Sequence, residues 1–433
     1  MTVSLVVAIV TGVLVCASVV FLPSVRICGK QWDVYPIVAL LGAVVCVVGG
    51  VVPTDYVVNG LVADTSVNPL KILVLFLSMT FLSVYLDELG VFEYLANKAL
   101  SLGKGKQTML FAILYVTVAV LTVFTSNDII VLTFTPFICA FCRRANISAV
   151  PYLFCKFVAA NTWSMCLVIG NPTNIYLATS ANIDFGSYFA TMALPTVVGG
   201  VVSFVVLRLL FAKQLNVPVQ IATDEHATLS DKTEVAVGAA HLVVCLVLLA
   251  IGSYIGLEMW IASVALALSL CVFTEVISIS RHVKPAVLWH ALKRLPYQLI
   301  PFVLGMFVLV LSLQYNGDTA RLAQLLDCKA NVWSFGISGL IVANVINNIP
   351  MAVLYSSVFG ALPEVGVGAI YAAVAASNIG AYLTPVGALA GIMWLGILKK
   401  EHVNVGFGTF VKYGATVALP TLAATLAMLS LVV

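Results

Sequence analysis

The chain has 433 residues, of which 62% are apolar and only 9% are charged, whereas soluble domains contain about 25% charged residues. Lys and Arg (21) exceed Asp and Glu (18), which gives a net charge of +3. This composition leaves too little polar surface for a water-soluble globule. It excludes a secreted disulfide scaffold, a nucleic-acid-binding protein and a cytosolic enzyme, and it predicts a protein whose partner is the lipid bilayer.

Apolar runs alternate with polar breaks along the whole chain and predict five membrane spans in each half. A spanning helix needs about 20 residues, so no length remains for a sizeable soluble domain. The spans expected in the first half are 3–22, 35–52, 70–90, 150–169 with a continuation past 175, and 188–212. Those expected in the second half are 235–252, 258–275, 297–315, 369–380 with a continuation to 398, and 409–432.

Two further apolar stretches, 107–142 and 332–360, are too long for one span and are broken mid-way by polar residues. Each predicts a re-entrant hairpin of two helices. Basic residues at both ends of the first hairpin place both ends in the cytoplasm: Lys104, Lys106, Arg143 and Arg144. The second hairpin, flanked by Asp327 and Glu364, is expected to enter from the opposite face.

The longest polar stretch, 213–234, is expected to be a cytoplasmic linker between a first half, 1–212, and a second half, 235–433. An odd number of crossings per half requires the second half to be inverted. We therefore expect an all-α polytopic membrane protein, built as an inverted repeat of five spans and one re-entrant hairpin per half, with discontinuous helices at the midplane. This layout is typical of secondary transporters.

The tip of the first hairpin carries Ser126, Asn127 and Asp128. Backbone that leaves a helix inside hydrocarbon costs several kcal/mol per unsatisfied group, so the break predicts a cavity lined by protein or water. Helix N-termini attract anions, while the Asn127 and Asp128 oxygens suit a cation. The alternative is that Asp128 only N-caps the second arm, although an ionisable group at this depth is usually functional.

Three more polar clusters occupy corresponding places. Gly170, Asn171, Thr173 and Asn174 interrupt a span around Pro172, where a simple proline kink is the alternative. The other clusters belong to the second half, at the second hairpin tip (Asn347 and Asn348) and at a second interrupted helix (Ser377, Asn378, Thr384, Pro385 and Gly387). The symmetry of the four clusters favours one binding site at the midplane over four unrelated breaks.

Other polar residues leave alternatives open. Lys156 is expected to extend to the cytoplasmic interface, although it could face the site. Asp87 and Glu88 end a span and are expected to be interfacial rather than liganding. Cys139 and Cys142 favour packing over a metal or redox pair. Neither an H-E-x-x-H motif nor a phosphate-binding loop occurs, so we expect no enzyme and no bound cofactor.

Several motifs resemble those of arsenite permeases. Residues 86–93 (LDELGVFE) resemble their LDExGxFE stretch, and 127–136 resemble their NDxxxxxxTP hairpin. Residues 347–350 (NNIP) resemble their second NNxP, and 383–387 (LTPVG) their ITPIG. The resemblance covers nearly the whole chain and implies membership of the ion transporter superfamily, which also includes citrate and sodium/dicarboxylate carriers and sodium/proton antiporters.

The resemblance implies an inverted repeat with two re-entrant hairpins, often dimeric. It also implies that Asn127 and Asn348 help to form cation sites, for example for sodium, with the anion held between the tips. The chain departs from arsenite permeases at Asn161, Asn378 and Tyr382, where they carry Asp, Asp and Lys. Its GNPTN loop at 170–174 is closer to the G-x-P-x-N loop of carboxylate carriers.

We therefore expect a multi-pass protein of the cell or inner membrane that transports an anion or arsenite/antimonite by alternating access, coupled to a proton or sodium gradient. A sodium-coupled di- or tricarboxylate carrier, a sodium/proton antiporter and a channel are the alternatives, and a membrane enzyme is a rival class. Expected partners are the bilayer, the small substrate, a second copy in a homodimer and, for a true arsenite pump, a cytoplasmic ATPase subunit.

Overall fold

The computed structural model describes residues 2–22, 24–27, 30–64, 68–100, 106–217, 231–326, 331–362 and 365–433. Residues 218–230, which form most of the predicted linker, lie outside the described residues. The same holds for Lys104, Asp327 and Glu364, which flank the predicted hairpins.

The described part of the first half is helical apart from one small sheet. Its elements are α1 (Val3–Phe21), β1 (Ser24–Ile27), β2 (Lys30–Asp33), α2 (Val34–Val48), α3 (Thr54–Val62), α4 (Pro69–Glu88), α5 (Val91–Leu100), α6 (Gln107–Phe124), α7 (Asn127–Arg144), α8 (Ala149–Trp163), η2 (Ser164–Cys166), η3 (Val168–Gly170), α9 (Pro172–Ser180), α10 (Phe185–Leu210) and α11 (Ala212–Leu215). Strands β1 and β2 pair antiparallel, with Ser24 opposite Asp33 and Ile27 opposite Lys30.

The described part of the second half is entirely helical. Its elements are α12 (Lys232–Ile255), α13 (Met259–Ser280), α14 (Ala286–Lys293), α15 (Leu299–Tyr315), α16 (Asp318–Leu326), α17 (Asn331–Ile346), α18 (Asn348–Ala361), α19 (Val367–Gly380), α20 (Leu389–Lys400) and α21 (Phe407–Val432). Helix α12 begins at Lys232, so the second half starts slightly earlier than the sequence predicts.

The prediction of an all-α, multi-pass membrane protein is confirmed. Each predicted span coincides with a helix or with an interrupted pair of helices. Six helices among the described residues are long and apolar enough to cross a bilayer on their own, namely α4, α6, α10, α12, α13 and α21. Helix α6 is one of them because its 18 residues have a mean hydropathy of 2.0 and contain no charged residue, although the sequence predicts only one arm of a hairpin there. The re-entrant path stays a prediction.

The two halves contain the same series of elements. In each half, two helices lead through a short helix (α3 or α14) to a third long helix (α4 or α15). A short amphipathic helix (α5 or α16), a hairpin (α6–α7 or α17–α18), an interrupted helix (α8–α9 or α19–α20) and a last helix (α10 or α21) follow. Contacts correspond as well, since α2 packs on α15 and α4 on α13, while α7 packs on α20 and α9 on α18. This supports the predicted repeat, and the inversion across the membrane stays a prediction.

Equivalent glycines turn the chain after the third long helix of each half. Gly90 (φ 78°) follows α4, and Gly317 (φ 73°) follows α15. Residues with a side chain rarely adopt this left-handed conformation, which ends a helix and redirects the chain. The axes of α15 and α16 consequently differ by 82°.

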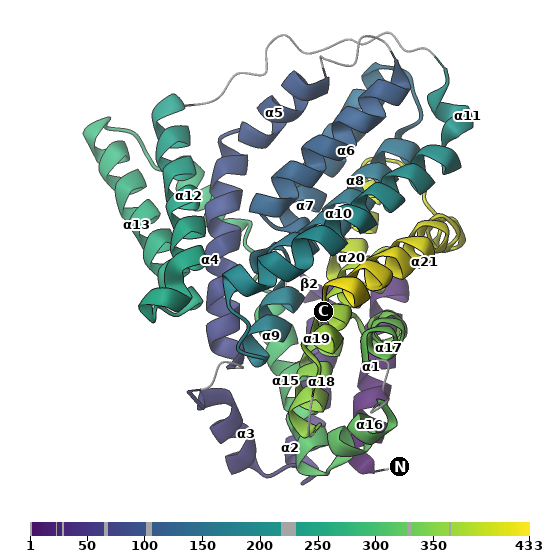
Figure 1. Ribbon diagram of the computed structural model, residues 1–433. Coiled ribbons are helices and arrows are strands. Elements are labelled where there is room, and N and C mark those ends of the chain that lie inside the picture. The colour runs from purple at the N-terminus through teal and green to yellow at the C-terminus, as the bar shows by residue number, and fades with distance from the viewer. Residues whose placement is uncertain are drawn as a thin grey trace.

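The interrupted helices form the centre of the molecule. All residues of α19 except Val367 and nearly all of α8 are buried, so other helices surround both of them. Helices α10 and α21 pack against each other and cross in front of this centre, while α12 and α13 stand to one side with α4 (Figure 1). The α5 end of α4 and the short helix α16 lie at opposite ends of the molecule (Figure 1).

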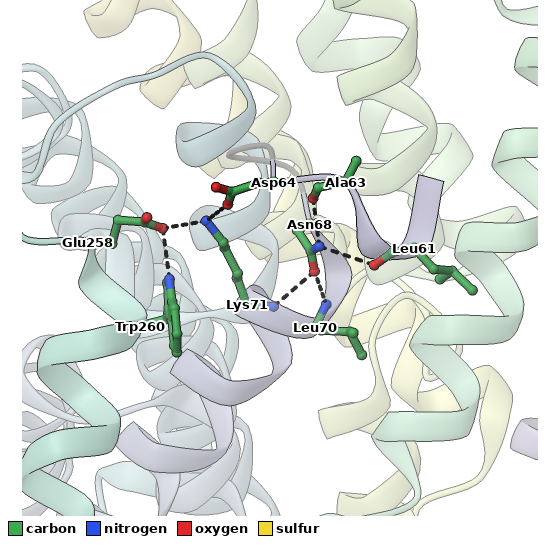
Figure 2. A network of polar contacts seen from close by, with 8 residues as sticks. All are labelled: Leu61, Ala63, Asp64, Asn68, Leu70, Lys71, Glu258 and Trp260. Carbon is green, nitrogen blue, oxygen red and sulfur yellow. Dashed lines mark hydrogen bonds and ion pairs between the residues drawn. The ribbon is translucent and has the colours of Figure 1, made fainter. Parts of the chain in front are cut away.

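A polar network secures the start of α4 (Figure 2). Asn68 caps this helix, because its Oδ1 accepts from the Leu70 and Lys71 amides while its Nδ2 donates to two carbonyls of the preceding turn. The Lys71 ammonium pairs with Asp64 (2.6 Å) and with Glu258 (2.7 Å), which precedes α13. The network therefore ties the α3–α4 connection to the α12–α13 connection.

Candidate functional site

The first hairpin tip is a short break between α6 and α7. Helix α7 restarts at Asn127 with Ser126 in the N-cap position, and the Ser126 side chain makes no capping hydrogen bond. Its buried hydroxyl has no hydrogen-bond partner among the described residues. Asp128 lies in the first turn of α7, one position beyond the helix start. The alternative that Asp128 N-caps this helix is therefore wrong.

Asn127 has one satisfied and one unsatisfied amide atom. Its Nδ2 donates to Oδ1 of Asn161 on α8 at 3.0 Å, and the Asn161 Nδ2 donates to the Phe157 carbonyl at 2.8 Å. The Asn127 Oδ1 is buried and accepts no hydrogen bond from the described residues. Leaving such an oxygen unpaired costs about 1–3 kcal/mol, and amide oxygens are also ligands for hard cations. The Asn127 Oδ1 at this tip is therefore free to bind a cation or to accept a hydrogen bond from a ligand.

The second hairpin tip has the same property at Asn348. Asn347 takes a left-handed φ of 79° and caps α18, because its Oδ1 accepts from the Ile349 amide. Its Nδ2 donates to the Val386 carbonyl at 2.9 Å, and the Asn348 amide donates to the Gly387 carbonyl at 3.0 Å. The Asn348 Oδ1 is buried without a partner in the described part of the chain.

The loop after α19 is fixed by an asparagine of α17. The Asn344 Oδ1 accepts from the backbone amide (3.1 Å) and the hydroxyl (2.7 Å) of Thr384, and its Nδ2 donates to the Gly380 carbonyl. A Cβ atom on Gly387 would lie 2.3 Å from that same carbonyl oxygen, so the site requires glycine. Pro385 lies in this loop between Thr384 and Gly387. The second tip and this loop therefore form one unit.

The interruption of the first span consists of η2 and η3. A Cβ atom on Gly170 would lie 2.1 Å from the Ser164 carbonyl oxygen, so the two turns can only stack with glycine there. Asn171 then caps α9 by accepting from the Thr173 amide, with Pro172 at the first helical position. The Asn174 Nδ2 donates to the freed Ser164 carbonyl at 2.8 Å. Two interruption residues thus satisfy backbone groups that the break exposes.

Side chains from the two interrupted helices bond to one another, although they come from different halves. The Asn378 Oδ1 accepts from the Ser164 hydroxyl (2.7 Å) and from the Asn171 Nδ2 (3.0 Å). The Asn378 Nδ2 donates to the Asn174 Oδ1 at 2.6 Å. We call these four side chains the cross-half network. Beside it, the Thr173 and Ser377 hydroxyls share a hydrogen bond of 2.9 Å.

The structure thus separates the predicted site residues into two groups. The first group forms hydrogen bonds with other protein groups and joins the helices. It consists of the cross-half network together with Thr173, Ser377 and Thr384. Ser126, Asn127 and Asn348 instead hold buried oxygens without partners in the described chain. Asp128, which is partly exposed, likewise forms no ion pair with the described residues. Among the predicted site residues, the polar groups without a partner in the described chain therefore lie at the hairpin tips.

The expectation that Lys156 reaches the cytoplasmic interface is wrong. Its side chain is 0% exposed, and its Nζ donates to the Thr135 hydroxyl (2.6 Å) and the Val131 carbonyl (3.3 Å) of α7. Helix α8 packs against α6, α7, α10 and α19, so the Lys156 side chain is surrounded by other helices rather than by the membrane interface.

Asp87 and Glu88 lie at the end of α4, away from the tips. Arg294 pairs with both carboxylates, at 2.8 and 2.5 Å. Asp87, Arg294 and Thr133 line a cavity of about 410 Å³ against the second arm of the first hairpin. An equivalent cavity of about 640 Å³ lies between α15, α16 and α18 and is lined by Gln314 and Ser357.

The cysteines of α7 show no site of their own. Cys139 and Cys142 are buried and unoxidised. Within the described ranges, three or more His, Cys, Asp or Glu side chains do not come close enough together to hold a metal ion.

Sequence reasoning missed Ser164. It marked Asn344 at the second hairpin tip and Asn161 as a departure from arsenite permeases, but it did not identify either as a partner of the predicted residues. Each is a polar residue within an apolar helix or directly before a break, and this is the signal that could have identified them. Their partners lie up to 214 residues away, so spacing alone does not reveal them.

Comparisons with known proteins agree with this architecture. The family model described as citrate transporter matches residues 33–376. The arsenical pump membrane protein of Escherichia coli (strain K12) is 26% identical over 412 residues, covering 91% of this chain and 92% of the relative. An uncharacterized transporter of Synechocystis is 25% identical over 390 residues, covering 83% and 85%.

The fold is also similar to a solved structure. The YdaH transporter of Alcanivorax borkumensis superimposes with a TM-score of 0.55 at 13% identity, over 99% of this chain and 97% of that one. These matches confirm the predicted membership of the ion transporter superfamily near the arsenite permeases and the multi-pass membrane location.

Proposed function

The chain belongs to the citrate transporter family and is an integral membrane transporter, and from this premise we propose that it is a secondary active carrier of a small anion or of arsenite. In this proposal transport proceeds by alternating access and is driven by a sodium or proton gradient. Its relatives are transporters rather than enzymes.

The observation that carries the proposal is the pair of unpartnered amide oxygens at the hairpin tips. The Oδ1 atoms of Asn127 and Asn348 occupy corresponding places in the two halves, and both are buried without a donor among the described residues. Buried polar atoms are nearly always satisfied, so these two oxygens are suited to accept a ligand. A cation at each tip would satisfy these oxygens, which favours sodium as the coupling ion.

The substrate is proposed to lie between the tips. Helices α7 and α18 begin there, and N-terminal amides favour negative charge. The names of the matched proteins suggest citrate or arsenite as the chemistry to test. A sodium-coupled di- or tricarboxylate carrier is the second candidate, because the unpartnered tip oxygens favour a metal cation over a proton.

Two cavities support alternating access. The one beside Asp87 and the one beside Gln314 each reach the second arm of a hairpin, α7 or α18. They lie near α5 and α16, at opposite ends of the molecule (Figure 1). In this proposal each cavity forms the entrance from one side of the membrane.

The experiment that tests the function is uptake into proteoliposomes containing the purified protein. Radiolabelled citrate, succinate, sulfate and arsenite are offered separately, with a sodium gradient, a proton gradient or neither. We expect saturable uptake of one of these substrates that depends on one gradient. A conductance that persists without any gradient coupling would instead identify a channel and contradict the proposal.

A further inference from the structure

Lys156 and Asp128 differ from all other charged residues of the hairpin region. We call α6 to α10 together with α17 to α21 the hairpin core. The other charged residues described in the hairpin core lie at outer helix ends, in caps or on the exposed surface: Arg143, Arg144, Asp184, Arg208, Lys399, Lys400, Glu401 and Lys412. Lys156 is at the middle of α8, and Asp128 is at the hairpin tip. Charges in such places are costly and usually functional.

Lys156 has polar acceptors but no carboxylate in contact. Its Nζ donates to Thr135 and to the Val131 carbonyl, and it lies 5.9 Å from the ring centroids of Phe157 and Trp394. Within the described residues it forms no salt bridge. Neutral acceptors and aromatic faces stabilise an ammonium group locally but leave its net charge uncompensated.

Asp128 likewise lacks a partner of opposite charge in direct contact. It forms no salt bridge among the described residues, and it is the one acidic residue of α7. Helices α7 and α8 run side by side, joined by Asn127 and Asn161 at the tip and by Thr135 and Lys156 further along. Thr135 follows Asp128 by seven residues, so both lie on one face of α7, about 10 Å apart along the helix. Asp128 and the contact between Thr135 and Lys156 therefore lie along the same face of α7.

We propose that Lys156 is a positioning residue that compensates the charge of Asp128, so that the empty site is electrically neutral and each bound cation requires one negative charge on the substrate. This inference rests on the proposed function and assigns the substrate to the anions rather than to uncharged arsenite. A cation with a monovalent anion, or two cations with a dianion, restores neutrality.

The inference predicts how each variant carries out the return step of transport. The neutral empty site of the wild type returns unloaded, which permits net uptake. Lys156→Met leaves one uncompensated negative charge, so the empty site retains a cation and net uptake falls while exchange continues. Asp128→Asn leaves one positive charge and retains an anion. The double variant is neutral again.

The experiment compares net uptake with exchange in proteoliposomes, using radiolabelled citrate and, separately, arsenite as probes. In each single variant the ratio of net uptake to exchange should fall roughly tenfold. This is the order of magnitude for two unit charges separated by about 10 Å, the helix rise from Asp128 to Thr135, at an effective dielectric constant near 20. Membrane potential should affect the two single variants with opposite sign. The double variant should regain most of the ratio, whatever its absolute rate.

Two control variants separate charge from packing. Lys156→Arg keeps the charge, and Thr135→Val removes an acceptor of Lys156 without changing any charge. Both should keep the wild-type ratio. If Lys156→Met is not recovered as a folded protein, Lys156→Gln provides the neutral comparison.

The possible failures are distinguishable. Wild-type citrate transport with an unchanged ratio in both single variants would overturn this inference and leave the proposed function standing. Transport of arsenite but not citrate would also overturn it, because arsenite is uncharged at neutral pH. If the wild type transports none of citrate, succinate, sulfate and arsenite under either gradient, the proposed function and this inference are both rejected.

Discussion

The Ser164 hydroxyl donates a hydrogen bond of 2.7 Å to Oδ1 of Asn378, across 214 residues of sequence. This bond joins the interruption of the first-half helix to that of the second-half helix, and both groups are fully buried. In the proposed carrier, the two breaks therefore move together. The hairpin tips, which hold the unpartnered oxygens, are attached to this joined centre through Asn161 and through the loop at 384–387.

Asp128→Asn should abolish most of the dependence of uptake on the cation gradient, because it removes the one acid of the first hairpin tip. The variant should still insert, since Asp128 makes no ion pair with the described residues. Uptake under imposed gradients, normalised to the amount of reconstituted protein, measures this effect. Wild-type rates under the same gradient would sink the assignment of Asp128 to the site.

Asn127→Ala and Asn348→Ala should each weaken the apparent cation affinity by about tenfold or more, since a hydrogen bond or contact to a charged partner contributes about 1.5–3 kcal/mol. The two effects should be comparable, because the residues hold equivalent unpartnered oxygens. Titration of the cation at fixed substrate gives both values. If one substitution has no effect, the symmetric model is wrong for that half.

Gly170→Ala should destabilise the protein by about 1–3 kcal/mol, the usual effect of overpacking. Its Cβ would lie 2.1 Å from the Ser164 carbonyl oxygen, which is backbone and cannot move aside cheaply. Gly396→Ala on α20 is the matched control, because nothing lies within 4 Å of that position. Thermal unfolding in detergent compares the two, and equal midpoints would show that the stacked turns are not needed.

The ion pairs at the start of α4 predict a pH effect. Hydrogen bonds from Lys71 hold the pKa values of the Asp64 and Glu258 carboxyls below their usual range. Groups with a lowered folded-state pKa stabilise the fold above their unfolded pKa, about 4, and lose this contribution as the pH falls. Lys71→Met should therefore lower the unfolding temperature slightly at pH 7 and have a smaller effect at pH 3.

The control for this prediction is Lys412→Met, which removes an exposed lysine of α21. It should leave the unfolding temperature unchanged at both pH values. A destabilisation by Lys71→Met that is the same at pH 3 as at pH 7 would show that packing, rather than the ion pairs, fastens the two connections.

Hydropathy and helix-breaking residues predict most of this fold, because the bilayer requires apolar spanning helices and allows a helix to break only where polar residues can satisfy its backbone. Unsatisfied backbone is costly in hydrocarbon, so a break such as that at Gly170 needs Gly, Pro and Asn nearby, and these residues are visible in the sequence. The same signal locates both tips. The sequence determines helix lengths next to such a break less well. Helix α6 is long enough to cross the membrane, although the sequence predicts only one arm of a hairpin there.

The partners of the site residues could not be predicted in the same way. Asn378 bonds to Ser164 and Asn171 only because the two halves pack together, and single-sequence spacing contains no such information. The prediction for Lys156 failed for a related reason. Snorkelling assumes a helix that faces lipid, whereas α8 is enclosed by other helices.

Thiol accessibility tests the central claim of alternating access between inverted halves most directly. Single cysteines at Thr133 and at Ser357, which line the two cavities, are introduced after replacement of the ten native cysteines. Membrane-impermeant reagents should label Thr133→Cys from the cytoplasmic side and Ser357→Cys from the outside. A change of cation or substrate gradient should raise one rate while lowering the other. Labelling of both from one side, or rates that rise and fall together, would contradict the account.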